Sequence, residues 1–183
     1  MDFITKFPRT AKQHDSIMVV VEKLTKASHF IPVNSSHKED NIVDIFMCEV
    51  DRLHGVPKKI VSDRDSKFTS NFWKGLFKEF GTNLNFSTTY HLETNGQTKR
   101  VNRVTEDMLI MYVTDKPSKW EYYLHLVEFS YDNGYHESLK MSPFEALYGR
   151  KCNMPISWDN PTDHAIVGPY LLQEMEEKLE KIG

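Results

Sequence analysis

The pattern of apolar and polar residues predicts five short strands. Each is a brief run rich in β-branched or aromatic side chains, and such runs are typical of strands buried on both faces or packed under a helix. The runs occupy residues 2–4, 17–21, 29–33, 59–62 and 84–88. Pro32 lacks a backbone N–H, so the third strand is expected at a sheet edge. Strands and helices in this order indicate an α/β fold with a five-stranded mixed sheet flanked by helices.

Apolar residues at helical spacing predict helices between and after these strands. Capping boxes, in which a Ser hydroxyl and a Glu three residues later satisfy the first helical N–H groups, occur at Ser36, Ser118 and Ser142. Thr69 or Ser70 is expected to cap another helix, which Gly81 ends. The predicted helices begin near residues 36, 69 or 70, 97, 118, 142 and 170, and the one beginning near 97 reaches 114.

Composition places the chain among ordinary globular proteins. It has 183 residues, of which 39% are hydrophobic and 12% aromatic, enough for one domain with a substantial core. No apolar run approaches twenty residues and no signal peptide is seen, so an intracellular, non-membrane protein is expected. Cys48 and Cys152 are too few for a disulfide framework or a zinc cluster, which suits a reducing compartment.

The distribution of charge matters more than the net value of −3. Basic residues gather in two places, around Asp63 and next to Gly96, whereas acidic residues crowd the C-terminal tail. The two basic groups are Lys58, Lys59, Arg64 and Lys67, and Lys99, Arg100 and Arg103. A basic rim on an acidic protein is compatible with DNA contact. A solvated surface of mixed charge explains the pattern equally well.

Two motifs carry the strongest functional signal. Ser62-Asp-Arg-Asp65 begins where the fourth strand ends, at the carboxyl edge where α/β sheets place their sites. Gly96-Gln-Thr-Lys-Arg-Val-Asn102 leads into a helix. With Asp2-Phe3-Ile4 at the start, these motifs resemble the integrase core of a Ty3/gypsy-type retrotransposon. Further matches in the same order are Arg52 to Gly55, Phe68 to Ser70 and Ser142 to Arg150.

The resemblance implies a ribonuclease H-like fold over residues 1–158, the integrase catalytic core, followed by a linker and helix at 159–183. It also implies a nuclear protein that acts on DNA, both the element's own ends and the target. Such cores commonly self-associate, so a homo-oligomer is expected, with the Tyr- and Leu-rich helix after Ser118 as a candidate surface. Neither a small-molecule substrate nor a membrane is implied.

In this family two aspartates and a glutamate hold two Mg²⁺ or Mn²⁺ ions for DNA end cleavage and strand transfer, which makes active members polynucleotidyl transferases and endonucleases. Asp2 and Asp63 match the aspartates. The family's spacer of thirty-five residues is filled by residues 64–98, so Lys99 stands where the glutamate belongs. Hard divalent cations want oxygen ligands, which a protonated lysine cannot supply.

Lys99 therefore predicts an impaired site. We expect weak or single-metal occupancy, little or no catalysis, and an ion pair from Lys99 to Asp2 or Asp63 in its place. Two ways to compensate stay open: Glu93 swings in as a ligand, or the Lys99 ammonium itself neutralises phosphate charge. Leu92, Glu93 and Asn95 depart from the family's usual Pro, Gln and Asp, which points to a decaying copy.

Four residues are candidates for DNA contact: Ser66, at a position that faces target DNA in the family, and Lys67, Arg100 and Arg103, which would position phosphates. The competing reading is a non-catalytic module that keeps the fold for DNA binding or dimerisation. A ribonuclease H that cuts RNA–DNA hybrids would need another carboxylate after Asp63, and Asp65 is too near to supply it.

Overall fold

A computed structural model describes residues 1–87, 92–114 and 116–152, and in the helix that begins at Leu92 the side chains of residues 92–95 and 97 are left out. Its strands are β1 (Asp2–Ile4), β2 (Ser16–Val21), β3 (Ser28–Val33), β4 (Lys59–Ser62) and β5 (Asn83–Phe86). All five predicted strands are present, within one or two residues of the expected bounds. The predicted helix at 170–181 and the domain boundary at 158 lie outside the described residues.

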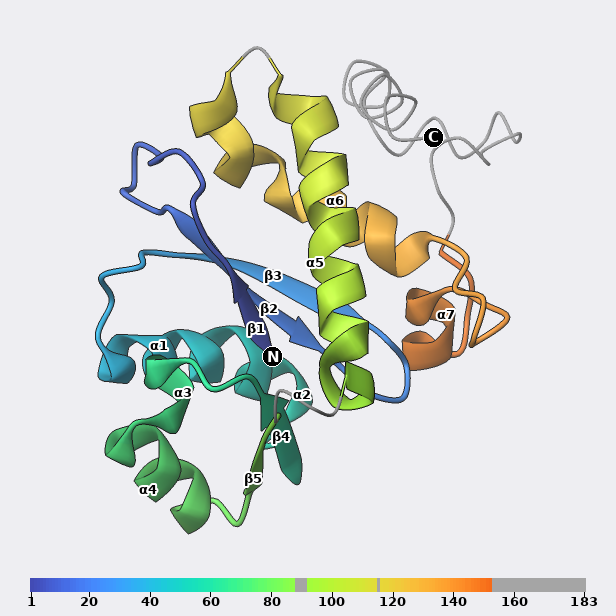
Figure 1. The fold of residues 1–183 in the computed structure, drawn as a ribbon. Helices are drawn as coiled ribbons and strands as arrows, with labels where there is room; N and C mark the ends of the chain where they lie inside the picture. The colour runs from blue at the N-terminus through green and yellow to red at the C-terminus, as the bar shows by residue number, and fades with distance from the viewer. Residues whose placement is uncertain (88–91, 115, 153–183) are drawn as a thin grey trace.

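The strands form two hydrogen-bonded ladders (Figure 1). β1, β2 and β3 pair antiparallel, with Asp2 opposite Val19, and β4 pairs parallel to β5. The ladders meet where the Met1 amino group donates to the Val61 carbonyl oxygen of β4, at 2.7 Å. The mixed strand directions are as predicted, but the described strands do not join into one continuous five-stranded ladder. β3, with Pro32, is an edge strand as expected.

The helices are mostly where the apolar pattern puts them. They are α1 (Glu39–Phe46), the π-helical turn η1 (Met47–Asp51), α2 (Arg52–His54), α3 (Ser66–Thr69), α4 (Asn71–Glu79), α5 (Leu92–Val113), the 3₁₀ turn η2 (Pro117–Lys119), α6 (Trp120–Asn133) and α7 (Pro143–Tyr148). No described helix is both long and apolar enough to cross a membrane.

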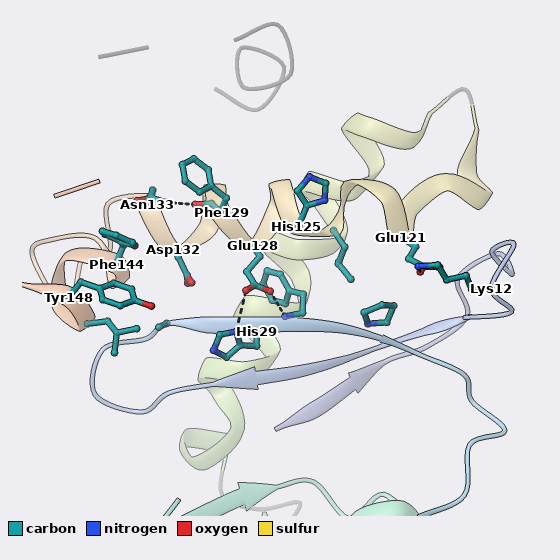
Figure 2. Close-up of a pocket in the computed structure, with 15 residues that line it drawn as sticks. Lys12, His29, Glu121, His125, Glu128, Phe129, Asp132, Asn133, Phe144 and Tyr148 are labelled. Atoms are coloured by element: carbon teal, nitrogen blue, oxygen red, sulfur yellow. Dashed lines mark hydrogen bonds and ion pairs between the residues drawn. The ribbon is translucent and has the colours of Figure 1, made fainter. Parts of the chain in front are cut away.

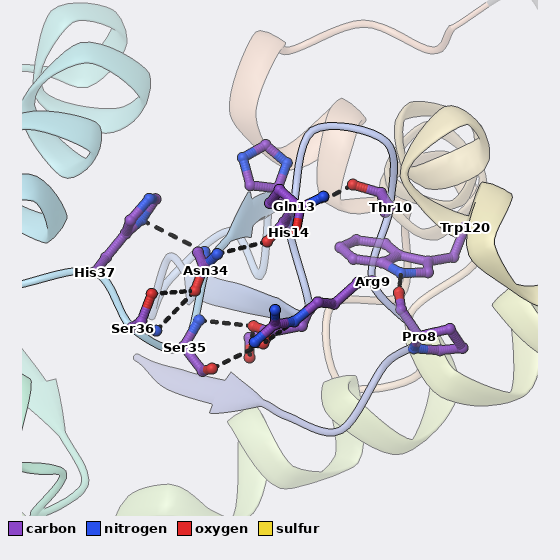
Figure 3. Close-up of polar contacts among 12 residues, drawn as sticks. Pro8, Arg9, Thr10, Gln13, His14, Asn34, Ser35, Ser36, His37 and Trp120 are labelled. Atoms are coloured by element: carbon purple, nitrogen blue, oxygen red, sulfur yellow. Dashed lines mark hydrogen bonds and ion pairs between the residues drawn. The ribbon is translucent and has the colours of Figure 1, made fainter.

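Two predicted caps are wrong. Ser36 does not cap α1, because its hydroxyl donates to Asn34 Oδ1 at 2.6 Å, in the loop before the helix (Figure 3). Ser118 does not cap α6 either, since it lies within η2 and the helix begins two residues later. Two other predicted caps are confirmed: Ser70 accepts from the Trp73 N–H, and Ser142 accepts from the Glu145 N–H.

α5 also begins earlier than predicted, at Leu92 instead of residue 97. The loop prediction rested on Gly96, which lies inside the helix. A glycine costs a helix roughly 0.5–1 kcal/mol relative to alanine but does not end it. On α5 the residues Val101, Thr105 and Leu109 are buried, whereas Met111 is exposed.

β2 carries the core on both of its faces. Met18 and Val20 face a cluster with Ile42, Phe46, Trp73 and Phe77 from α1 and α4. Ile17 and Val19 face a second cluster with Val101 and Leu109 of α5 and Trp120, Leu124 and Val127 of α6. A strand buried on both sides explains the unbroken run Ile17–Val21. The helices that sandwich it hold β1 and α5 in fixed relation, and this positions the site.

Candidate metal and nucleic-acid site

Asp2 and Asp63 come together at the junction of the two ladders. Asp2 is the first residue of β1, and Asp63 directly follows β4. The Asp2 carboxyl is close enough to Asp63 to act on its ionisation through both a side-chain hydrogen bond and charge. The structure thus brings together two of the three residues that the sequence assigns to the metal site.

Asp63 is held in a setting that disfavours its charge. Burial raises the pKa of Asp63 to about 6, a hydrogen bond from the Asp65 N–H opposes this shift, and the neighbouring Asp2 carboxylate adds to it. Two carboxylates in contact without a cation between them repel each other. Their oxygens are the ligands that Mg²⁺ and Mn²⁺ prefer, so the donor set suits a hard divalent ion.

Asn102 completes this arrangement, and the sequence reasoning missed it. Its Nδ2 donates to Asp2 Oδ2 at 2.9 Å, while Asp2 Oδ1 accepts from the Phe3 N–H. Asn102 Oδ1 is buried and has no partner among the described residues. The signal was available in the helical period, because Asn102 lies three residues after position 99 on the same face of α5.

Lys99 does not pair with either aspartate in the described structure. It is exposed on α5 and lines a shallow groove of about 590 Å³ with Lys6, Asn102 and Arg103. No ion pair joins Lys99 to Asp2 or Asp63 in the part of the chain that the structure describes. The expected ion pair is therefore wrong in this structure, since the amide of Asn102 takes the Asp2 oxygen instead.

The described residues contain no group of three or more His, Cys, Asp or Glu side chains able to hold a metal ion. The side chain of Glu93 is outside the described residues, so its proposed compensating role is not placed. Glu106 and Asp107 line the far part of the groove. Asp2 and Asp63 thus offer two carboxyl groups to a metal ion, fewer than the three side chains of such a group.

The four predicted DNA-contact residues are distributed unequally. Arg103 lines the groove with Lys99. The Lys67 ammonium lies 4.8 Å from the ring centre of Phe3, the neighbour of Asp2, and the exposed Ser66 begins α3. Arg100 lies on another side of α5, where its charge acts on Tyr131 and His136. Ser66 and Lys67 therefore lie near the aspartates, Arg103 lies in the groove of Lys99, and Arg100 lies elsewhere on α5.

A second hollow, of about 550 Å³, lies between β3, α6 and α7 (Figure 2). It is lined by Phe129, Phe144 and Tyr148 and by a polar group that the sequence did not single out. Glu128 bridges to β3, with Oε1 3.2 Å from His29 Nδ1 and Oε2 accepting from the Phe30 N–H. Asp132 accepts from the Ser28 N–H at 2.9 Å.

Comparison with known proteins places this geometry in a family. No protein-family model matches the chain. The Tf2-3 and Tf2-4 transposon polyproteins of Schizosaccharomyces pombe are each 32% identical to it over 148 residues, which is 81% of this chain and 11% of theirs. The chain thus spans about a tenth of the length of these relatives.

Solved structures agree on the fold. The HTLV-2 integrase catalytic core domain, solved in complex with magnesium, superposes with a TM-score of 0.61 at 13% identity, covering 79% of this chain and 93% of that one. The BIV integrase catalytic core domain superposes with a TM-score of 0.59 at 18% identity, covering 79% of this chain and 91% of that one. The chain is homologous to the Ty3/gypsy-type Tf2 polyproteins and has the ribonuclease H-like fold of an integrase catalytic core. In this integrase-like core, the junction of β1, β4 and α5 holds Asp2, Asp63 and Lys99.

Proposed function

We propose that residues 1–158 are the catalytic core of a retrotransposon integrase whose metal site is impaired by Lys99, with 159–183 as a linker and helix. The observation that carries this is the contact between the Asp2 and Asp63 carboxyl groups, one at the start of β1 and the other directly after β4. Among the described residues, no lysine, arginine or histidine forms an ion pair with either of them. Homology to a retrotransposon polyprotein supports DNA as the substrate and the nucleus as the place of action.

Asp2 and Asp63 would hold Mg²⁺ or Mn²⁺. When bound, such an ion activates the attacking oxygen of water or a DNA hydroxyl and stabilises the leaving oxygen in phosphodiester cleavage and strand transfer. Asn102 fixes the Asp2 carboxylate through its 2.9 Å hydrogen bond and so keeps one oxygen in a defined direction. Lys6, Lys99 and Arg103 give the adjoining groove positive charge, which suits a DNA phosphate.

The experiment is cleavage of a branched DNA-end mimic in Mn²⁺ by the full chain and its Lys99→Glu variant. We expect at least tenfold more product from Lys99→Glu. Lys99→Gln is the matched control, because it removes the charge without adding a carboxylate, and it should stay as inactive as the parent. Adding Asp63→Asn to Lys99→Glu should abolish the gain.

Equal cleavage by the parent and Lys99→Glu would contradict the impairment and would indicate that Glu93 or the Lys99 ammonium compensates for the missing glutamate.

The second candidate function is a DNA-binding or dimerisation module without catalysis, and the exposed Lys99 and Arg103 in the groove favour it. It predicts salt-dependent DNA binding with no cleavage by either form. Self-association of such a module would appear as a homodimer or larger species in light scattering.

A further inference from the structure

Two histidines far apart in the sequence point their ring nitrogens at each other. His29 lies on β3, and His54 is the last residue of α2. Their Nε2 atoms are 2.7 Å apart, and the ring centres are 4.9 Å apart with the planes tilted by 40°. Neither residue belongs to the Asp2–Asp63 site, and the function proposed above does not use them.

Glu128 of α6 sets the ring of His29. Its Oε1 lies 3.2 Å from His29 Nδ1, and its Oε2 is fixed by the Phe30 N–H at 2.8 Å (Figure 2). A carboxylate accepts, so His29 Nδ1 carries the proton, and the neutral ring then has its lone pair on Nε2. A carboxylate behind a histidine, directing its other nitrogen outward, is the usual support of a metal-ligating histidine.

The facing pair would have to open slightly to take an ion. Imidazole nitrogens bind zinc at about 2.0–2.1 Å, which in tetrahedral geometry separates two of them by roughly 3.3 Å. Moving from 2.7 Å to that value needs only a small displacement of His54. His54 is exposed and is followed by Gly55, which has a φ of 76°, so this helix end is free to adjust.

The surrounding charge favours a cation. The hydrogen bond to Glu128 raises the pKa of His29, and the charge of Glu49 adds to this shift. Burial and the neighbouring His29 lower the pKa of His54, and the charge of Glu22 opposes that shift. Glu22 Oε2 already accepts N–H bonds from Leu24 and Thr25, so it contributes charge without leaving its turn. Water would fill the remaining coordination positions.

We propose that His29 and His54 form a two-histidine site for a borderline transition-metal ion, such as Zn²⁺ or Ni²⁺, separate from the carboxylate site. Imidazole nitrogens select such ions, whereas carboxylate pairs select Mg²⁺ or Mn²⁺, so the two sites differ in chemistry. A bound ion would link the edge strand β3 to the end of α2.

Calorimetric titration of the full chain with Ni²⁺ at pH 8 tests this site. We expect one ion with micromolar affinity, and at least a tenfold loss in both His29→Gln and His54→Gln. Glu128→Gln should weaken binding by about 10–100-fold, because the carboxylate that orients the His29 ring through Nδ1 is lost. His125→Gln is the matched control: it alters an exposed histidine in the same hollow and should bind like the parent.

Circular dichroism checks that each variant is folded, and His54, being exposed, offers a substitution that leaves the core untouched. Asp63→Asn should leave Ni²⁺ binding unchanged, which separates this site from the carboxylates. Absence of Ni²⁺ binding by the parent, parental affinity in folded His54→Gln, or an equal loss in His125→Gln would overturn the proposal. Failure of the cleavage experiment would leave it unaffected.

Discussion

At the scale of single residues, the site depends on which groups reach the aspartates. Asn102 reaches Asp2, and Lys99 does not. An amide gives Asp2 a donor without adding positive charge, so the Asp2–Asp63 pair keeps its need for a cation. Elsewhere, the half-buried carboxyl group of Asp132 accepts a hydrogen bond from the Ser28 N–H and lines the hollow between β3, α6 and α7.

Asp132 makes stability depend on pH. Burial raises its pKa from 3.8 to about 7, the Ser28 N–H opposes this, Glu128 adds to it and His29 opposes it. Between about pH 4 and 7 the folded chain thus binds more protons than the unfolded one, and stability falls as pH rises. His29 acts in the same direction, because its pKa is raised by Glu128 and that gain is lost above the folded value.

Asp132→Asn keeps an oxygen that can accept from the Ser28 N–H and replaces the titratable carboxyl group with an uncharged amide. We expect the variant to be more stable than the parent by about 2 kcal/mol at pH 8 and to match it near pH 4. Urea unfolding at both pH values measures this. An unchanged pH slope in the variant would show that Asp132 is already charged in the folded chain.

At the scale of elements, a predicted serine N-cap forms where no tertiary contact competes for the residues of the capping motif. Ser142 accepts from Glu145 N–H at 3.1 Å and begins α7. Glu121, the expected box partner of Ser118, instead ties α6 to the β1–β2 connection: it accepts from Thr10 Oγ1 at 2.7 Å and pairs with Lys12 Nζ at 2.9 Å. Trp120 adds to this with a bond from Nε1 to the Pro8 carbonyl at 2.8 Å (Figure 3).

A pair of serine substitutions tests the caps. Ser142→Ala should cost about 1 kcal/mol of unfolding free energy, because it removes the N-cap acceptor of α7. Ser118→Ala, with the same chemistry at a position that caps nothing, should stay within about 0.5 kcal/mol of the parent. Equal costs in urea unfolding would mean that the cap assignments are wrong.

At the scale of the whole molecule, β2 separates two clusters. Ile42 of α1 lies in one and Ile17 of β2 in the other, and both side chains are fully buried. The sheet between them keeps their side chains from sharing neighbours. Substitutions in the two clusters should therefore change the free energy of unfolding independently, while the chain still unfolds as one unit.

Ile42→Val and Ile17→Val remove one methylene from each cluster. Each should cost about 1 kcal/mol, and the double variant should cost the sum within about 0.5 kcal/mol. Urea unfolding of the three variants measures the coupling. A coupling energy well above 0.5 kcal/mol would show that the two faces form one mechanically continuous core.

Much of this architecture follows from local pattern. β-branched runs located the strands, and Asp63 was placed correctly because it directly follows one of them. The sequence did not reveal long-range partners that compete with local rules, namely Asn34 for Ser36 and the β1–β2 connection for Glu121. The facing of His29 and His54 depends on tertiary contact, which no short spacing encodes, whereas Asn102 could have been found from its helical spacing to position 99.

We propose that Asp2 and Asp63 form a metal site that lacks its third carboxylate, because Lys99 occupies that position. Mn²⁺ binding followed by electron paramagnetic resonance tests it most directly, in the parent, Lys99→Glu, Lys99→Gln and Asp63→Asn chains. We expect the parent to bind Mn²⁺ weakly and Asp63→Asn not to bind it. Lys99→Gln should bind Mn²⁺ like the parent or slightly better. Lys99→Glu should bind Mn²⁺ at least tenfold more tightly than the parent and take up a second ion. Equal binding by Lys99→Glu and Lys99→Gln, or parental binding by Asp63→Asn, would contradict it.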